Sequence, residues 1–536
     1  MIQSKCPKSY SDGSIRKFHK KDKNEKRKKM FSSVLTADVR GIAGTPIVVE
    51  TDISDGLPGL TMVGYLTSAV KESADRVRTA LKNTKISIPP KKITINLSPA
   101  DTKKEGTGFD LAIAVSMMCS LGMFPKESVE GILFLGELGL DGSVKEIRGI
   151  LPMVEMAKSM GCKVCVLPKG NEMEGNIIEG IRCVGVENLK EVQHRIITKD
   201  FKLATIQENS ISTETSELDF AQIRGQEGVK QAAKIAAAGR LNLLMIGPPG
   251  SGKTMIARRI PTILPQMTRE ESLEVTKIYS VCGMIPKGQA LMTERPFRAP
   301  HHTISVSAMI GGGRKPMPGE VSLSNHGCLF LDEISLLPRN ILESLRQPLE
   351  DKMVKISRVN GTDLFPANVM LIAAMNPCKC GYYPDMNKCH CSASDISRYL
   401  NKISMPFIDR MDLCVEAPRV VFEELTGKME GETSEKIRQE VLAAHQIQTE
   451  RYKGTSYRFN ADVKGAAIEE YFKVGRKQKN LLEEAFERLN LTARSYHKIL
   501  KVSRTIADLA ESQEIQERHI LQAICYRNVD RKFWAV

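Results

Sequence analysis

Short apolar runs recur along residues 31–202 and alternate with segments of helical spacing. The runs at 46–50 and 92–97 are rich in β-branched residues, which predicts strands. Apolar residues in 69–81 recur every three or four positions, which predicts an amphipathic helix, whereas the nearly continuous apolar run 109–121 predicts a buried one. Strands and helices are thus expected to be interspersed in this stretch.

From 218 to 420 the pattern changes to short, fully apolar runs that end in glycine or polar residues. These runs lie at 243–246, 328–331 and 369–375. Such runs are typical of parallel strands that are buried on both faces, and they predict an α/β domain. The preceding segment 203–217 is rich in Ser, Thr and Glu, which predicts an interdomain linker.

The region 421–536 changes again, because its apolar residues follow helical spacing almost throughout. In 481–489 and 496–507 they fall on one face of a helix. We therefore expect the chain to end in a helical lid domain, which follows the α/β domain.

Length and composition agree with a chain of several domains. At 536 residues the chain is too long for one core, and 42% hydrophobic with 26% charged residues is typical of globular proteins. No apolar stretch approaches the roughly 20 residues of a membrane span, and no signal peptide is recognisable, so we expect no membrane partner and a cytoplasmic location. The thirteen cysteines lie mostly inside apolar runs, as reduced thiols do.

The net charge of +14 is concentrated at the start of the chain. Residues 1–30 carry eleven Lys and Arg against three acidic residues, a net charge of +8. This segment has little to bury, which predicts a basic disordered extension. It is either a nucleic-acid-binding arm or a solvated extension that precedes a start at Met30.

One motif carries a specific chemistry, because it matches the phosphate-binding pattern G-x-x-x-x-G-K-[ST] between a predicted strand and a predicted helix. Its residues are Gly247, Pro248, Pro249, Gly250, Ser251, Gly252, Lys253 and Thr254. The glycines let backbone N–H groups surround phosphate oxygens, and the helix N-terminus favours an anion. Lys253 is expected to reach the terminal phosphates and the Thr254 hydroxyl to ligate Mg²⁺. The motif predicts binding of a nucleoside triphosphate with Mg²⁺.

Polar residues at the ends of two later apolar runs predict hydrolysis. Asp332 and Glu333 follow the run 328–331, where Asp332 is placed to ligate Mg²⁺ and Glu333 to orient and deprotonate water. Asn376 follows 369–375; it either positions the attacking water or is a turn residue at a strand end.

Two arginines are candidates for the γ-phosphate. Arg410 lies between acidic residues, so it is either half of a structural salt bridge or an arginine finger supplied to a neighbouring subunit. Arg494 begins a predicted lid helix, from which it is expected to touch the nucleotide, although Arg504 on the same helix competes for that role.

Four cysteines form a C-x-C…C-x-C pattern: Cys378, Cys380, Cys389 and Cys391. Four thiols in a polar loop predict a tetrahedral Zn²⁺ site, in which His390 is an alternative ligand. The spacing is tighter than the usual C-x₂-C, and reduced free thiols or a redox role remain as alternatives. Because the loop follows Asn376, a metal there would brace that residue.

These features together resemble AAA+ ATPases. Asn376, Arg410 and Arg494 resemble sensor 1, the arginine finger and sensor 2, and Gln226 resembles the residue beside the adenine pocket. The stretches 295–305 and 318–327 resemble the Mg chelatase-like branch, and within it the ComM/YifB-type proteins. The resemblance implies a cytoplasmic hexameric ring, and in ComM-type members a DNA helicase that promotes branch migration during natural transformation.

The ring resemblance also suggests where DNA would bind. The segment 353–365 alternates and contains Asn360-Gly361, a strong hairpin signal. In helicase-like rings a hairpin before sensor 1 projects into the channel, where Lys355 and Arg358 would follow phosphates; the alternative is a solvated hairpin on the outside. The glycine-rich loop 311–315 is a second candidate.

The region 31–202 resembles the proteolytic (S5-like) domain of Lon. The stretch 104–110 matches the segment that carries Lon's nucleophilic serine, and Gly108 occupies the serine position; Met153 occupies that of the base lysine. Neither residue can attack a carbonyl or accept a proton, so the resemblance implies an α+β domain of this fold without peptidase activity.

The fold expected from the sequence is therefore an AAA+ P-loop core with a C-terminal helical lid, preceded by an inactive Lon-protease-like domain. The expected function is an ATP-driven hexameric motor that acts on single-stranded or branched DNA. Two alternatives are a chelatase-type ATPase subunit with a non-DNA substrate and a nucleotide-gated scaffold that moves nothing.

Overall fold

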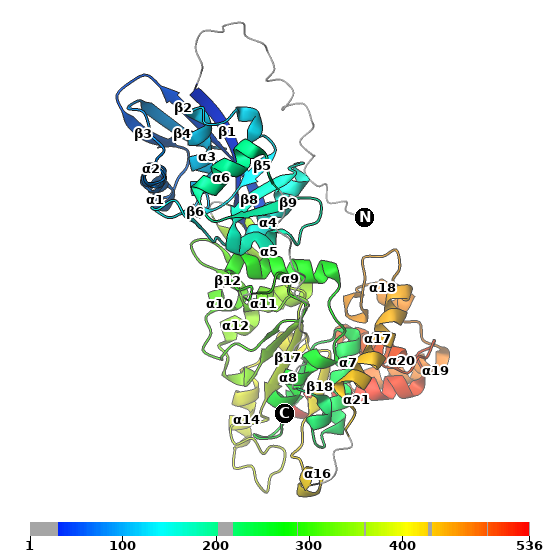
Figure 1. The fold of residues 1–536 in the computed structure, drawn as a ribbon. Coiled ribbons are helices and arrows are strands. Elements are labelled where there is room, and N and C mark those ends of the chain that lie inside the picture. Colours follow the sequence, from blue (N-terminus) through cyan, green and yellow to red (C-terminus); the bar gives the residue numbers. More distant parts are fainter. Residues whose placement is uncertain are drawn as a thin grey trace.

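The computed structural model describes residues 30–201, 218–286, 288–358, 361–426, 431–489 and 491–534. The basic extension before Met30 and the linker predicted for 203–217 lie outside these residues. Figure 1 shows the N-terminal strands and helices, coloured blue to cyan, at one end of the molecule and the remaining elements, coloured green to red, at the other.

Seven N-terminal strands form a mixed sheet in the order β3-β4-β2-β1-β5-β8-β9. Their bounds are β1 Met30–Arg40, β2 Ala43–Ser54, β3 Gly59–Val63, β4 Lys92–Ser98, β5 Ile132–Phe134, β8 Val164–Pro168 and β9 Arg182–Val186. The strands predicted at 46–50 and 92–97 are confirmed as parts of β2 and β4. β2 is longer than predicted because it pairs antiparallel with β1 on one side and β4 on the other.

Helices cover this sheet, and a short pair of strands lies beside it. The elements are α1 Ser68–Lys71, α2 Ser73–Asn83, α3 Asp110–Ser120, α4 Ile150–Ser159, α5 Glu172–Gly175, α6 Leu189–Thr198, β6 Glu137–Leu138 and β7 Val144–Lys145. α3 packs on β1 and β2, and all of its residues are buried, as its unbroken apolar sequence predicts. The helix predicted over 69–81 is present as α1 and α2, which meet at Glu72.

A second, five-stranded sheet has the order β11-β14-β17-β10-β18, and every pair in it is parallel. The strands are β10 Leu243–Ile246, β11 Phe297–Arg298, β14 Cys328–Leu331, β17 Met370–Met375 and β18 Leu413–Glu416. The three strands predicted from fully apolar runs are therefore confirmed as β10, β14 and β17. Their side chains are buried on both faces, which explains why the runs do not alternate.

Two small hairpins and several helices surround this parallel sheet. The hairpins pair β12 Gly311–Gly312 with β13 Met317–Pro318, and β15 Met353–Arg358 with β16 Gly361–Pro366. The helices are α7 Glu227–Gly239, α8 Lys253–Ile263, α9 Arg269–Cys282, α10 Val306–Ile310, α11 Glu320–Leu323, α12 Arg339–Ser344, α13 Arg346–Asp351, α14 Ala393–Leu400, α15 Met405–Ile408 and α16 Phe422–Thr426. The hairpin predicted over 353–365 is confirmed, although its tip, 359–360, lies outside the described residues.

The rest of the chain is helical, as predicted. The helices are α17 Ser434–Arg451, α18 Ala467–Tyr471, α19 Arg476–Arg488, α20 Ala493–Leu509 and α21 Glu517–Trp534. α17 and α20 pack on α7, and α21 packs on β18. The buried His445 of α17 lies 3.2 Å from the Ala237 carbonyl at the end of α7. No helix among the described residues has the length and apolar character needed to cross a membrane.

The N-terminal sheet domain contacts the part of the chain that holds the parallel sheet through α4 and α9. The Gly149 N–H, just before α4, donates to the Ser280 carbonyl of α9 at 3.0 Å, and the Ser280 hydroxyl donates to Glu174. Leu273 of α9 packs into the apolar cluster beneath α4. The contact combines backbone hydrogen bonds with apolar packing, so α9 joins the two parts of the chain.

Candidate nucleotide site and metal centre

The phosphate-binding motif forms the turn between β10 and α8. Gly250 and Gly252 have φ values of +75° and +83°, which residues other than glycine rarely adopt. At Gly247 a Cβ would lie 2.1 Å from the Ala417 carbonyl oxygen, so only glycine allows the ends of β10 and β18 to approach this closely. The glycines therefore shape a loop whose last residue leads directly into the N-terminus of α8.

Lys253 lies over this loop. Its Nζ donates to the carbonyls of Gly247 and Pro248 at 2.8 and 2.9 Å, and it lies 3.3 Å from Asn376 Oδ1. Burial lowers the pKa of Lys253, and the nearby Asp332 and Glu333 oppose that shift. The structure thus brings Lys253 and Asn376 together, although they are 123 positions apart in the sequence.

Asp332 and Glu333 follow β14 at the same edge of the sheet. The Thr254 hydroxyl donates to Asp332 Oδ2 at 2.7 Å, so the two residues expected to bind Mg²⁺ are neighbours. Glu333 is exposed, and its φ of +46° is unusual for a residue with a side chain. A strained backbone of this kind is often found at functional sites. Hydroxyl and carboxylate oxygens suit Mg²⁺, so this edge of the sheet fits a magnesium nucleotide.

Gln226 lies beside the loop, immediately before α7. Its Nε2 donates to the carbonyl of Ser251 at 3.1 Å and to that of Pro418. Its Oε1 is buried, and within the described part of the chain it has no hydrogen-bond partner. A buried acceptor without a partner is costly, so Oε1 is suited to receive a donor from a ligand in this pocket.

Arg410 and Arg494 lie at the opposite end of the parallel strands. Asn242, which precedes β10, donates to the Arg410 carbonyl at 3.0 Å, whereas the phosphate-binding loop follows β10. Both guanidinium groups approach Glu350, and the contact of Arg494 measures 3.8 Å. The ion pair expected for Arg410 exists, but its partner is Glu350 of α13 and not a flanking acid.

The two arginines line a cavity of about 420 Å³ together with Lys498, Lys501 and Asp412. Within one chain, neither arginine is beside its own phosphate-binding loop. The expectation that Arg494 touches the nucleotide is not met within one chain, because α20 packs on α7 and α21 and places Arg494 beside Glu350. Glu350 was not identified from the sequence, since nothing in its local pattern indicates two arginine partners.

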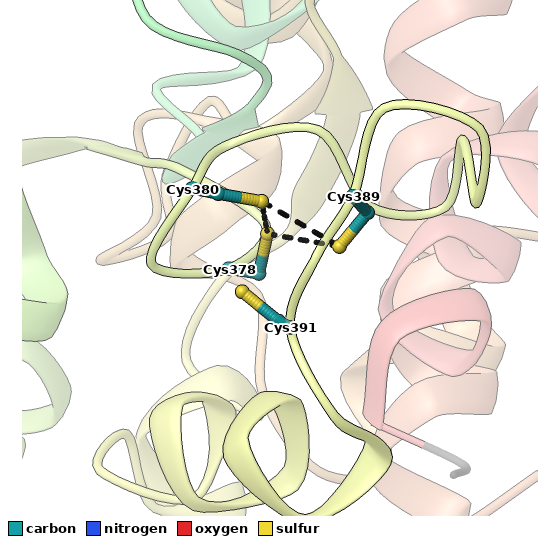
Figure 2. Close-up of side chains that lie close together, drawn as sticks. All are labelled: Cys378, Cys380, Cys389 and Cys391. Atoms are coloured by element: carbon teal, nitrogen blue, oxygen red, sulfur yellow. Dashed lines mark hydrogen bonds between the residues drawn. The ribbon is translucent and has the colours of Figure 1, made fainter.

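The four cysteines of the C-x-C…C-x-C pattern converge in one loop, as Figure 2 shows. The Sγ atoms of Cys378 and Cys380 lie 3.3 Å apart, and Cys389 Sγ lies 3.8 and 3.5 Å from them. With Cys391, all four sulfurs lie within 4.8 Å of one another. His390 is exposed and does not belong to this group.

The cysteine cluster concentrates negative charge on one sulfur. Although burial opposes it, backbone N–H groups of Tyr382 and His390 lower the pKa of Cys380 to about 6. Burial and the contact with that thiolate raise the pKa of Cys389 to about 12. Closely spaced sulfurs with N–H donors around a thiolate are the chemistry that a soft, tetrahedral cation such as Zn²⁺ requires.

A larger cavity, of about 660 Å³, lies between the N-terminal sheet domain and the two hairpins. Gly108 and Met153, the residues expected at the positions of Lon's serine and lysine, both line it, as do Lys315 and Arg358 from the hairpins. Lys315 Nζ lies 3.6 Å from Asp38. The two candidate DNA-contacting segments are thus neighbours, and both face the N-terminal domain.

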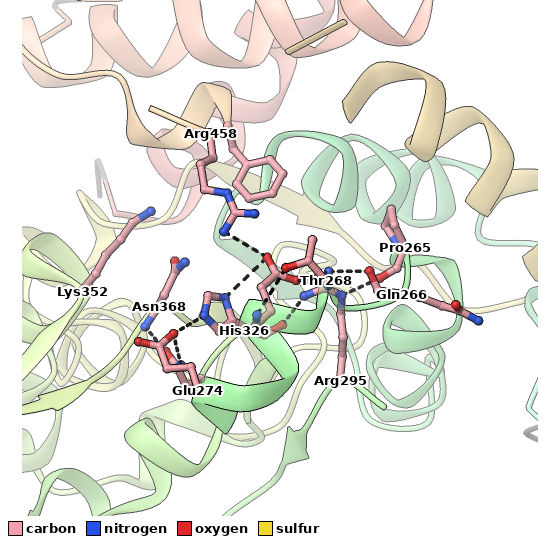
Figure 3. A network of polar contacts seen from close by, with 12 residues as sticks. Pro265, Gln266, Thr268, Glu274, Arg295, His326, Lys352, Asn368 and Arg458 are labelled. Carbon is pink, nitrogen blue, oxygen red and sulfur yellow. Dashed lines mark hydrogen bonds and ion pairs between the residues drawn. The ribbon is translucent and has the colours of Figure 1, made fainter. Parts of the chain in front are cut away.

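The two stretches that resemble the Mg chelatase-like branch meet in a polar network, which Figure 3 shows. Arg295 donates to the His326 carbonyl at 2.7 Å and to Glu271 Oε2 at 3.0 Å, and the His326 ring contacts Glu274. The Arg298 guanidinium donates two hydrogen bonds, of 2.6 and 2.8 Å, to the Glu320 carboxylate. These residues therefore hold β11 and α9 beside β14, a structural role that sequence reasoning did not assign.

Comparisons with known families cover most of the chain. The model "Magnesium chelatase, subunit ChlI" matches residues 219–425, "Subunit ChlI of Mg-chelatase" matches 49–171, and "Magnesium chelatase, subunit ChlI C-terminal" matches 431–527. A weaker match, 28% identical over 163 residues, is to a Lon protease of Buchnera aphidicola; it covers 28% of this chain and 21% of that protein.

Two relatives match nearly the whole length. Competence protein ComM of Haemophilus influenzae is 39% identical over 499 residues, which are 92% of this chain and 96% of that protein. The uncharacterized protein YifB of Escherichia coli is 38% identical over 502 residues, which are 94% of this chain and 98% of that protein. The chain therefore belongs to the ComM/YifB-type family of Mg chelatase-like AAA+ proteins.

Proposed function

We propose that this protein is an ATP-hydrolysing ring motor that acts on DNA. The observation that carries the ATPase part is the meeting of Lys253, Thr254, Asp332 and Asn376 at one edge of the parallel sheet, beside Glu333. Magnesium, held by Thr254 and Asp332, would neutralise charge on the phosphates. Glu333 orients and deprotonates the attacking water, while Asn376 fixes its position.

The buried Oε1 of Gln226 supports ATP as the nucleotide. It is a buried acceptor beside the phosphate-binding loop, and the amino group of adenine is a donor, whereas guanine presents an oxygen at the equivalent ring position. The amide also contacts Ser251 within the phosphate-binding loop, so base and phosphate recognition are adjacent.

The proposal of a ring follows from the positions of two arginines and the phosphate-binding loop, which lie at opposite ends of β10. Arg410 and Arg494 lie at the end that precedes the strand, so they are available to a neighbouring subunit's γ-phosphate and not to their own. The hexamer is proposed by analogy with AAA+ rings. In such a ring Glu350 holds both arginines in place until a neighbour's nucleotide competes for them.

DNA is proposed as the substrate because two basic hairpins lie side by side. Lys355 and Arg358 of β15, with Lys315 of the 311–315 loop, offer phosphate contacts. The relative named as a competence protein supports a role in DNA uptake or recombination, in the cytoplasm. The region 31–202 is proposed to be a Lon-protease-like domain that serves in assembly or docking, since Gly108 and Met153 cannot form a catalytic dyad.

Zinc is the third proposed cofactor, in addition to ATP and Mg²⁺. The Cys378, Cys380, Cys389 and Cys391 sulfurs are already as close as a tetrahedral ion requires.

Steady-state ATP hydrolysis by the full chain, with and without forked and single-stranded DNA, tests this function. We expect severalfold stimulation by DNA, and a rate at least about 100-fold lower in Glu333→Gln, because a general base is removed. Glu484→Gln, an exposed acid on α19, is the matched control and should retain wild-type turnover. ATP turnover that no DNA changes would refute the DNA motor and favour a chelatase-type subunit; nucleotide binding without turnover would favour a scaffold.

A further inference from the structure

The cysteine loop lies directly against the candidate ATP site. Gly381, in the middle of the C-x-C…C-x-C segment, has a φ of +81°, and a Cβ there would lie 2.4 Å from the ring of Pro249. Pro249 belongs to the phosphate-binding loop. The backbone of the cysteine loop is therefore in contact with the loop that would surround the phosphates.

The next residue, Tyr382, contacts the other side of the same site. Its hydroxyl accepts a hydrogen bond of 2.8 Å from Arg419, whose guanidinium carbon lies 4.8 Å from the centre of the Tyr382 ring. Arg419 directly follows Pro418, whose carbonyl accepts from Gln226. Through Gly381 the cysteine loop thus touches the phosphate-binding loop, and through Tyr382 it touches Arg419, the residue after the one that Gln226 contacts.

Short turns, in one of which the Cys389 N–H donates to the Asp385 carbonyl at 2.8 Å, and the ring contact of Tyr383 with Phe533 shape this loop together with the four sulfurs. Residues 377–392 contain no helix or strand between β17 and α14. Cys378 and Cys389 are buried, and the Gly381 N–H donates to Cys378 Sγ at 3.2 Å. A tetrahedral zinc ion with Zn–S bonds of about 2.3 Å places its sulfurs about 3.8 Å apart, close to the observed 3.3–3.8 Å separations.

We propose that Cys378, Cys380, Cys389 and Cys391 bind one zinc ion, and that the zinc-held loop forms a wall of the ATP site, so that nucleotide affinity depends on zinc occupancy. The inference rests on the proposed ATP binding. Zinc does no chemistry here; it fixes Gly381 against Pro249 and Tyr382 against Arg419. Release of zinc frees the loop, and the phosphate-binding loop loses that support.

The test measures zinc and nucleotide binding separately on the full-length protein. Zinc per chain is determined by elemental analysis, and affinity by the fluorescence anisotropy of N-methylanthraniloyl-ATP in the presence of Mg²⁺. We expect one zinc per chain in the wild type. A zinc-selective chelator should remove the ion and weaken analogue binding at least about tenfold, and added Zn²⁺ should restore it.

Three variants separate the metal site from its effect. Cys391→Ser should lower both zinc content and affinity, whereas Cys525→Ser, an exposed cysteine on α21, should change neither. Gly381→Ala keeps all four sulfurs but places a Cβ against Pro249, so it should retain zinc and still weaken binding.

Two results would overturn the proposal: a wild-type chain that holds no zinc, or a zinc-free chain that binds the analogue as tightly as the zinc-bound chain. Chelation and repletion of the wild type decide the matter even if Cys391→Ser fails to fold. Failure of the ATP site itself is recognisable, because wild type with zinc bound would then show no analogue binding. Lys253→Ala calibrates that outcome, since it should lose the analogue and keep its zinc.

Discussion

Protonation of His445 should destabilise the nucleotide-binding part of the chain. This histidine of α17 is buried, and its ring nitrogen lies 3.2 Å from the Ala237 carbonyl at the end of α7. Burial, with a smaller contribution from Arg240 and Arg295, lowers its pKa from 6.5 to about 4. The folded state therefore binds fewer protons than the unfolded state between these two values, and stability must fall as the pH drops through that window.

The size of the effect follows from the two pKa values. At pH 7.5 both states hold a neutral ring, so the contribution is negligible. At pH 5 the unfolded ring is mostly protonated and the folded ring mostly neutral, which costs about 2 kcal/mol of unfolding free energy. The loss reaches its limit of about 3.4 kcal/mol below pH 4.

The measurement uses the single tryptophan of the chain. Trp534 donates to the Leu400 carbonyl at 3.1 Å and packs at the end of α21, so its fluorescence reports unfolding of this part in urea. His445→Gln retains an N–H donor but takes no proton. Between pH 7.5 and 5, the unfolding free energy of His445→Gln should fall by about 2 kcal/mol less than that of the wild type. Equal pH dependence in the wild type, in His445→Gln and in the exposed-site control His194→Gln would refute the reasoning.

Two further predictions concern the ring and its substrate. Lys253→Ala and Arg410→Ala should each lower ATP turnover about 1000-fold, yet a mixture of the two variants should recover activity, because an intact loop of one subunit meets an intact arginine of the next. A mixture of Lys253→Ala with Thr254→Ala is the control and should stay inactive. If the first mixture shows no recovery, the arginine does not act between subunits. Arg358→Ala should weaken the binding of single-stranded DNA and reduce the slope of log affinity against log salt concentration by about 1. Lys473→Ala, at an exposed position of the helical lid, should change neither quantity. An unchanged slope in Arg358→Ala would show that this hairpin does not contact the DNA phosphates.

The nucleotide site was largely predictable because its signals are local. A glycine loop between an apolar strand and a helix needs only a few consecutive residues, and Asp332 follows its strand directly. Parallel strands end at one edge of a sheet, which explains why Asn376, predicted at the end of an apolar strand, lies near Lys253. The hairpin β15–β16 was also predictable, since Asn-Gly favours its turn.

Pairings between distant segments were not predictable from local patterns. Glu350 lies 60 positions from Arg410, and Arg295 lies 31 positions from the His326 carbonyl that it contacts. The same holds for Gly381 and Pro249, because close packing of two loops leaves no periodic trace in either sequence. The cysteine spacing predicted a metal but not what the loop would touch.

The placement of the arginines has a consequence for how this protein would be controlled. A single chain carries a phosphate-binding loop after β10 and the arginines Arg410 and Arg494 before it. In the proposed ring each copy would therefore supply one half of two sites, and hydrolysis would require contact between copies. The N-terminal domain joins the part with the parallel sheet through α9, and Lys315 of a candidate DNA hairpin lies 3.6 Å from Asp38 of the N-terminal domain. In the proposed ring, we therefore expect contact between subunits to influence the access of DNA to the hairpins.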